Sequence, residues 1–438
     1  MVQTCAGIRY RMQRKTIALL LLLGLYCISG ACAQIATSPD SLRLSLQQLE
    51  QRFLDSNLAL ITSRYEISVA KAAVITAGLF DNPQLTVENV LYNPENKKIL
   101  DLSWSGTNSA ALSQVFSLAG KRNKSVRLAE SAVKLSELDF FELLRSLRFA
   151  LREDFYRMYF AQRAIELYAA QISSLQSVTT SFRAQLEKGN IARKELVRME
   201  ALLFSLQSEK AALISQVLET EAELKYLAKI PAATPLSLSW QPPGRLPSLS
   251  DFSLEEILHT ALEKRTDLAS ARELQRSHEL DLALQKALAM PEIAIGLTYD
   301  KQGNFTRNYN GLQLSLPVPL FNRNQGNIAA AKTRIEQGRY QVRQVEESVS
   351  QEVYRYYKTA LEAEKLATDV PPDFSEDISY LMGEVQKNYL KRNISLLDFL
   401  DFYDSFKETQ LKLDELRFNR VRSLEAINYA AGAAIIPL

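Results

Sequence analysis

The chain has 438 residues, and its 52 lysines and arginines almost balance its 50 aspartates and glutamates, which leaves a net charge of +2. This balance argues against nucleic acid as the main partner, because such proteins usually carry a clustered basic face. Glycine and proline number only 15 and 14, below their usual shares of roughly 7% and 5%. A chain with so few turn-forming residues is expected to consist mainly of long helices.

Few residues are available for catalysis or metal binding. His259 and His278 are 19 positions apart on one predicted helix, about five turns, which is too far for them to share a metal ion. All three cysteines lie within the first 32 residues, and neither histidine has a nearby Ser or Cys nucleophile. The sequence therefore predicts no enzyme, no cofactor and no metal site.

The N-terminus has the pattern of an export signal. Four basic residues precede an apolar run, Ile17–Ile28, that is followed by small residues. The run is too short to span a bilayer, so we predict a signal peptide over residues 1–33. Lipidation of Cys32 is the alternative, because the residues before it resemble a lipobox. Met12 is a second possible start beside Met1.

Beyond the signal, the chain reads as two similar halves. Residues 230–250 contain five of the 14 prolines and are predicted to form a linker, because proline blocks helix continuation. The linker separates a first repeat, residues 34–229, from a second repeat, residues 251–438. The nearly equal lengths indicate a duplication.

Both repeats begin with helix-period stretches, Leu46–Phe80 and Leu254–Met290. A proline and an alternating segment follow in each, with apolar residues at every second position, which is the strand signal. A second alternating stretch is expected near 111–118 and near 312–320. Each repeat is thus predicted as helix, strand, loop, strand and long helical hairpin.

The predicted hairpins have a measurable period. Apolar positions from Leu144 to Leu186 recur every 3.5 residues on average, which is the heptad value. Residues 118–188 contain no proline, enough for a helix of roughly 105 Å. A soluble helical bundle would show the same period.

The hairpin turns are also expected to correspond. Gly189, Asn190 and Ile191 align with Arg392, Asn393 and Ile394. Gly and Asn tolerate a positive φ, so Gly189 is predicted to be left-handed in the first turn. The second turn lacks the glycine, and there Asn393 is expected to take that conformation.

Four strands of about ten residues are unusual in an exported helical protein. That length suits a tilted crossing of an outer membrane. Four strands cannot close a barrel of useful diameter, whereas three chains would supply twelve and satisfy every backbone group in lipid. The alternative is a small soluble β-patch that caps the helices. Aromatic residues flank or join the strands, as interfacial aromatics would: Tyr92, Trp104, Tyr299, Phe305 and Tyr309.

The order of motifs resembles a known family. The segments ALSQVFSLAGKRNKSV and LSLPVPLFNRNQGNIAAAK occupy the same place in the two halves. They are similar to segments of the TolC family of outer-membrane efflux channels, most of all to its cation-efflux branch, the CzcC- and CusC-like proteins. The likeness covers almost all of residues 41–435.

This resemblance implies a mainly α fold with a small β part. A homotrimer would form a twelve-stranded β-barrel in outer-membrane lipid, with four strands per chain, and an α-helical barrel in the periplasm of a Gram-negative bacterium. The partners would be a periplasmic adaptor (membrane fusion protein) and an inner-membrane pump of the resistance–nodulation–division (RND) class. The chain itself would be a passive exit duct, with heavy-metal cations as the expected substrate.

The resemblance also implies functional residues near one end of the hairpins. Tyr389, Asp398 and Asp401 stand where the family has a gating tyrosine and pore aspartates. Three-fold symmetry would turn each aspartate into a ring that attracts cations, although ordinary solvated charges would show the same pattern. The turn residues are the expected adaptor-docking tips: Gly189, Asn190, Ile191, Arg392, Asn393 and Ile394. Ile394 replaces a basic residue of the family pattern, so no salt-bridge lock is expected there.

Other functions remain open from the sequence. General drug or solute efflux and type I secretion use channels of the same fold. A periplasmic adaptor is also exported and helical, but it has one hairpin between β-rich domains. A filamentous coiled-coil protein would not need strand pairs at the same place in both halves.

Overall fold

The structure is a computed structural model that describes residues 41–94, 97–101, 108–241, 246–302 and 306–438. The predicted signal peptide with Cys32 lies outside the described residues, as do Trp104, Phe305 and part of the predicted linker. The chain divides into two compact units. The smaller unit has residues up to Leu44 together with Pro231–Ser237, and the larger unit has Ser45–Ile230 together with Leu238–Leu438.

The smaller unit contains parts of two short strands that pair with each other. These are β1 (Leu42–Ser45) and β6 (Leu236–Ser239), which form a two-stranded sheet. The Leu42 N–H donates to the Pro235 carbonyl at 2.8 Å. Leu44 and Leu236 are buried.

In the larger unit, each repeat opens with two helices instead of the single helix that the sequence predicted. These are α2 (Leu46–Ser56) and α3 (Leu58–Gly78) in the first repeat, and α6 (Leu254–Lys264) and α7 (Thr266–Leu288) in the second. A 3-10 turn, η1 (Leu249–Asp251), precedes α6. His259 and His278 therefore lie on different helices, which corrects their expected placement on one.

The two breaks are equivalent. Asn57 and Arg265 are both extended, with ψ of 121° and 127°. The Asn57 side chain donates from Nδ2 to the Leu227 carbonyl at 2.9 Å, and the Arg265 guanidinium donates to the Ala430 carbonyl at 3.3 Å. In both repeats, a side chain at the break thus ties the first helices to the end of the returning helix.

The long hairpins follow the strands. The first consists of α4 (Lys121–Glu187) and α5 (Arg193–Leu227), and α4 is one uninterrupted helix of 67 residues, as predicted. The second consists of α8 (Gln325–Asp369), α9 (Phe374–Leu390) and α10 (Leu396–Ala431). Pro371 and Pro372 divide α8 from α9 because neither has an N–H for the helical ladder.

Helix α4 packs against α3, α5, α7 and α10, and α8 packs against α7 and α10. A buried cluster that includes Leu175, Met199 and Phe399 unites α4, α5, α9 and α10 near their turns. A second cluster, with Ile257, Val349 and Leu424, unites α6, α8 and α10. Heptad-spaced residues of α4, among them Tyr168, Leu175 and Val178, therefore belong to the core between the hairpins.

The sheet contains four antiparallel strands in the order β2-β5-β7-β8. They are β2 (Gln84–Asn89), β5 (Asn108–Phe116), β7 (Ile293–Asp300) and β8 (Tyr309–Ser315). Each repeat supplies two neighbouring strands, and β5 and β7 join the repeats. A two-stranded sheet, β3 (Tyr92–Asn93) with β4 (Lys98–Ile99), lies in the chain between β2 and β5.

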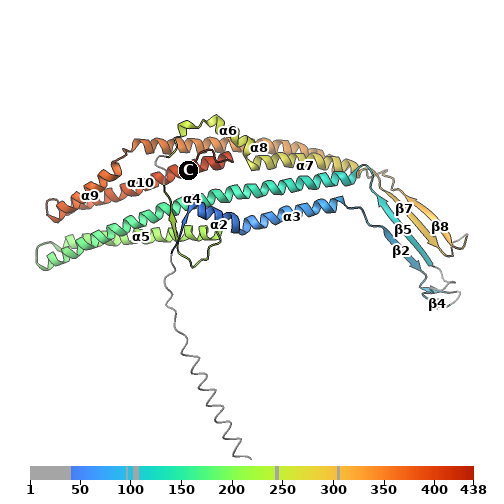
Figure 1. Cartoon of the computed structure of the whole chain (residues 1–438), viewed down its shortest axis with the longest axis horizontal. Coiled ribbons are helices and arrows are strands. Elements are labelled where there is room, and N and C mark those ends of the chain that lie inside the picture. The colour runs from blue at the N-terminus through green and yellow to red at the C-terminus, as the bar shows by residue number, and fades with distance from the viewer. Residues whose placement is uncertain (1–40, 95–96, 102–107, 242–245, 303–305) are drawn as a thin grey trace, which may run out of the picture. The chain divides into compact units, whose positions relative to one another are not determined.

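The strands were predicted in the right places but are shorter than ten residues. β8 ends at Ser315, whereas the sequence suggested a strand to Leu320. Pro317 and Pro319 explain the difference, because they cannot donate to a strand ladder. Within the larger unit, this sheet lies beyond one end of the long helices, and the hairpin turns lie at the other end (Figure 1).

The predicted fold class, mainly α with a small β part, is confirmed. Among the helices in the described part of the chain, none is both long enough and apolar enough to cross a membrane.

Candidate functional site

One candidate region is the four-stranded sheet, whose two faces differ in polarity. Leu85 on β2 pairs with Leu112 on β5, Leu112 pairs with Leu297 on β7, and Leu297 pairs with Leu312 on β8. This leucine row runs across the whole sheet, and all four side chains are exposed in the single chain. Val87, Ile295 and Leu314 share its face, because side chains alternate along a strand.

The opposite face is made mainly of small and polar residues, with Val115 of β5 as an apolar exception. Gln84 pairs with Ser113, Ser113 with Gly296, and Gly296 with Gln313. Thr86 and Thr298 lie on the same face by alternation. The sheet therefore presents one apolar and one polar surface.

The edges of this sheet are open. Among the described residues, no strand pairs with the outer side of β2 or of β8. Three successive antiparallel steps separate these two strands, so they run in opposite directions. A second copy could extend the sheet by antiparallel pairing at either edge.

The second candidate region is the pair of hairpin turns, which have equivalent backbones. The Gly189 and Arg392 N–H groups donate to the Leu186 and Tyr389 carbonyls, each at 2.9 Å. Gly189 has a φ of 73° and Arg392 a φ of 62°. The prediction that Asn393 is left-handed is therefore wrong.

The asparagines that follow have a shared role in closing the turns. The N–H groups of Asn190 and Asn393 donate to the Gln185 and Asn388 carbonyls at 2.9 Å. Their side-chain amides bond to the side chains of the same two partners, at 2.8 and 3.1 Å. Since this turn geometry places the positive φ one residue before the asparagine, Arg392 has to adopt it.

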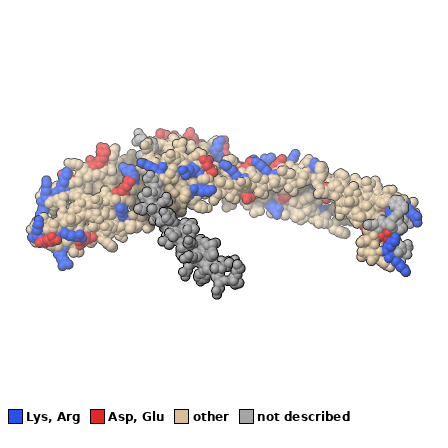
Figure 2. Space-filling model, turned by 60° about the horizontal axis from the view of Figure 1, so that its bottom comes forward, with Lys and Arg blue, Asp and Glu red and all other residues tan. Residues whose placement is uncertain are grey.

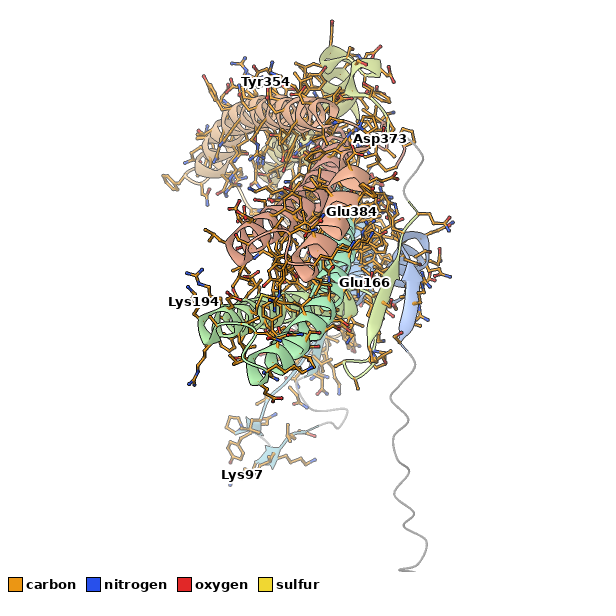
Figure 3. The ribbon with its side chains drawn as sticks, turned by 90° about the vertical axis from the view of Figure 1, so that its left-hand side faces the viewer. Lys97, Glu166, Lys194, Tyr354, Asp373 and Glu384 are labelled. Carbon is orange, nitrogen blue, oxygen red and sulfur yellow. The ribbon has the colours of Figure 1, made fainter. Side chains whose placement is uncertain are left out.

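The two turns lie side by side and share an open groove. The Arg392 guanidinium donates to the Asn190 carbonyl at 3.3 Å. A groove of about 630 Å³ lies between the turns and is lined by Ile191, Glu195 and Ile394 among others. Figure 3 shows the hairpins end-on, with Lys194 on the α4–α5 hairpin and Glu384 on α9. Basic and acidic side chains both occur over this end of the helices (Figure 2).

Tyr389 is buried between the hairpins, with only 6% of its surface exposed. Its ring stacks with Phe182 of α4 at 5.5 Å and with Phe399 of α10 at 4.4 Å between centroids. Its hydroxyl is buried and has no hydrogen-bond partner among the described residues. Burial, with a smaller contribution from the Glu195 carboxylate, raises the pKa of Tyr389.

Asp398 and Asp401 lie in the first two turns of α10, three residues apart and therefore on one face of the helix. Both are exposed. Asp398 has a structural role that the sequence analysis missed. It forms a capping box with Ser395, whose Oγ accepts from the Asp398 N–H at 3.2 Å and donates to its carboxylate at 2.7 Å. The Ser-x-x-Asp spacing was the available signal.

Sequence reasoning also missed two polar links between the hairpins. Lys407 of α10 donates to Glu209 of α5 at 3.0 Å, and Tyr168 of α4 donates to the same carboxylate at 3.0 Å. Although burial opposes it, the bonds from Lys407, Ser205 and Tyr168 hold the pKa of Glu209 below its usual range. Gln386 of α9 donates to Ser174 of α4 at 2.8 Å.

In the described part of the chain, no group of three or more His, Cys, Asp or Glu side chains is arranged to hold a metal ion. Asp398 and Asp401 are exposed, and neither has an ion-pair partner among the described residues.

Comparisons of sequence and of structure both find proteins that are similar to this chain. Residues 257–368 match the family described as outer membrane efflux protein. Over 279 residues the chain is 24% identical to the cobalt-zinc-cadmium resistance protein CzcC of Cupriavidus metallidurans. The matched segment covers 63% of this chain and 63% of the relative.

Solved structures show the same fold. A membrane protein from Pseudomonas aeruginosa superimposes with a TM-score of 0.73 at 16% identity, covering 88% of this chain and 92% of that chain. CusC superimposes with a TM-score of 0.68 at 15% identity, covering 92% of this chain and 96% of that one. The chain has the fold of the TolC-like outer-membrane efflux channels, and its sequence resembles theirs, with CzcC among its relatives.

Proposed function

We propose that this protein is the outer-membrane exit duct of a tripartite efflux system and works as a homotrimer. The observation that carries the proposal is the four-stranded sheet, which has one apolar face, one polar face and two open edges. A soluble β-patch would bury its apolar face against the helices, whereas the leucine row of this sheet is exposed.

Assembly of several copies would pair the open edges of their sheets with one another. A lone four-stranded sheet cannot close, and barrels with room for an interior begin at about eight strands. If β8 of each copy pairs with β2 of the next, three copies form a closed barrel of twelve strands. The leucine row would then face lipid, and the row with Ser113 and Gln313 would face the lumen.

The helical hairpins would continue this duct into the periplasm. Three-fold symmetry would place three copies of Asp398 and Asp401 around one axis, where a ring of carboxylates favours cations. The exposed turns at Gly189–Ile191 and Arg392–Ile394 would meet the periplasmic adaptor, and an inner-membrane RND pump would supply the energy.

Heavy-metal cations are the proposed cargo. Support comes from the likeness to CzcC, whose name assigns it to cobalt, zinc and cadmium resistance, and from the two exposed aspartates. The duct would be passive, so it needs no metal site of its own.

Membrane fractionation and mass determination test the assembly. The protein should occur in the outer-membrane fraction, and its detergent-solubilised form should have three times the mass of the processed chain. A monomer in the soluble periplasmic fraction would overturn the proposal. Cargo is tested separately by growth of a deletion strain on cobalt, zinc or cadmium salts, where unchanged resistance would exclude those ions.

The adaptor-docking residues have their own test. Ile394→Glu should abolish efflux while leaving the trimer intact, because it places a charge in the groove between the turns. Leu397→Glu is the matched control, because it adds the same single charge at an exposed residue that does not line the groove. Retained efflux in the Ile394 variant would exclude docking at this groove.

A further inference from the structure

A cavity of about 250 Å³ lies among α4, the first residue of α7 and the end of α10. Its apolar wall includes Phe141, Leu144 and the stacked pair Phe149 and Tyr429, whose ring centroids are 4.6 Å apart. Three arginines of α4 also line it, at positions 145, 148 and 152. Their spacing of three and four residues puts them on one face of the helix.

Two of these arginines form ion pairs with acidic side chains of the chain. Arg145 pairs with Glu142, donates to the Tyr429 carbonyl at 2.7 Å and lies over the Tyr429 ring at 4.1 Å. Arg152 pairs with Glu425 at 3.0 Å and with Glu50. Each of these guanidinium groups therefore has acidic partners within the protein.

Arg148 differs from both. Among the described residues, no acidic side chain pairs with it, and its Nε is buried without an acceptor. Two other polar side chains of the cavity already have hydrogen-bond partners within the chain. Asn428 exchanges hydrogen bonds with the Ile436 backbone, and Thr266 donates to Glu142. Glu425, the acidic residue that lines the cavity, is paired with Arg152. Among the described residues, Arg148 is therefore the guanidinium of this cavity that has no acidic partner.

An unpaired charge beside apolar walls is unfavourable, because it loses hydration and gains no partner. A guanidinium presents a planar fork of donors that matches phosphate and carboxylate groups. We propose that this cavity binds a small oxyanion, a phosphate or a carboxylate, through Arg148. This inference does not depend on the channel function, because it rests on charge and cavity alone.

A phosphate titration of the full-length protein, purified in detergent as its native oligomer, tests the proposal. Phosphate should raise the melting temperature when it replaces chloride at equal ionic strength. Arg148→Met keeps much of the chain length but removes the charge, and its phosphate response should weaken by about tenfold or more. Arg127→Met is the control, because Arg127 is exposed on the same helix and does not line the cavity.

Without phosphate, Arg148→Met should be at least as stable as the unchanged protein, because it removes an uncompensated charge. Citrate in place of phosphate tests whether carboxylates bind as well. If phosphate and citrate both fail to stabilise the unchanged protein, the proposal is wrong. If they fail and Arg148→Met also dissociates the oligomer, the partner is a carboxylate of a second copy, and the small-anion site is again excluded.

Discussion

The rings of Tyr389 and Phe399 lie 4.4 Å apart between centroids, and their planes are inclined by only 13°. Tyr389 is on α9 and Phe399 on α10, and Tyr389 also stacks with Phe182 of α4. The stack therefore joins the two hairpins close to their turns. Because the Tyr389 hydroxyl has no partner among the described residues, Tyr389 joins the hairpins through its ring.

Two substitutions at Tyr389 separate the ring from the hydroxyl. Tyr389→Phe should leave the free energy of unfolding unchanged or raise it by up to about 1 kcal/mol, because it removes an unpaired buried hydroxyl. Tyr389→Ala should cost about 3–5 kcal/mol by leaving a cavity. Chemical unfolding and hydrogen exchange of the two turns measure both effects. Equal destabilisation by the two substitutions would show that the hydroxyl matters.

The capping box of α10 decides how the pore aspartates should be tested. Asp398→Ala would leave the N-cap Ser395 in place but remove the carboxylate that bonds back to it, at a cost of about 1 kcal/mol. A loss of selectivity in that variant could then come from the lost charge or from the weakened helix start. Asp398→Asn combined with Asp401→Asn keeps an acceptor for Ser395 but removes both charges. Cation selectivity in single-channel recordings should fall, with little change in melting temperature. Asp373→Asn, before α9, is the control, and unchanged selectivity in the double variant would exclude a pore role.

Neighbouring residues on β8 test the two faces of the sheet. Leu312→Lys should block membrane assembly, because a lysine facing lipid at mid-depth costs about 2–4 kcal/mol. Gln313→Lys adds the same charge to the opposite face and should assemble normally, with altered ion conductance. The amount of trimer in the outer-membrane fraction reports the outcome. Equal loss for both variants would contradict the assignment of the faces.

The raised pKa of Asp154 on α4 predicts that the stability of the folded protein depends on pH in an unusual way. Burial raises its pKa to about 6, although Arg157 at 3.1 Å acts against this shift and Glu223 adds to it. In the unfolded chain the same carboxyl titrates near 3.8. Folding therefore takes up a proton between these values, so the contribution of Asp154 to stability improves as the pH falls through 6.

Asp154→Asn should remove this dependence. At pH 8 the variant should be more stable than the unchanged protein, by at most about 3 kcal/mol, and the difference should shrink towards pH 5. Urea unfolding over this pH range measures it, with exposed Asp139→Asn as the control. A variant that is less stable at pH 8 would show that the pair with Arg157 outweighs the cost of burial.

Much of the architecture follows from local sequence patterns. The proline-free stretch 118–188 predicted α4 almost to its ends, and the heptad spacing from Leu144 to Leu186 supported it. Period-2 alternation located all four strands of the large sheet. The duplicated order of elements is visible because both repeats use the same signals. These features depend on neighbouring residues, which a single sequence displays directly.

The differences arise where distant contacts or backbone geometry decide the outcome. At the breaks of the first helices, the side chains of Asn57 and Arg265 bond to carbonyls that lie far away in the chain. Arg392 is left-handed because the turn closes on Asn388. The sequence analysis also missed the division of α8 from α9, although Pro371 and Pro372 signal it.

The candidate site was predictable in position more than in detail. Tyr389 lies close to the turns, and its stack with Phe182 brings together residues more than 200 positions apart. The uncompensated charge of Arg148 emerges only once the partners of its neighbours are known. Spacing alone cannot distinguish a paired arginine from an unpaired one.

Single-channel recording of the purified protein in a planar bilayer tests the central claim most directly. The trimeric duct predicts discrete conductance steps that favour cations over anions, and that selectivity should fall when Asp398 and Asp401 are both changed to asparagine. A protein that inserts as a trimer but passes no current, or that never inserts, would contradict the assignment as an outer-membrane channel.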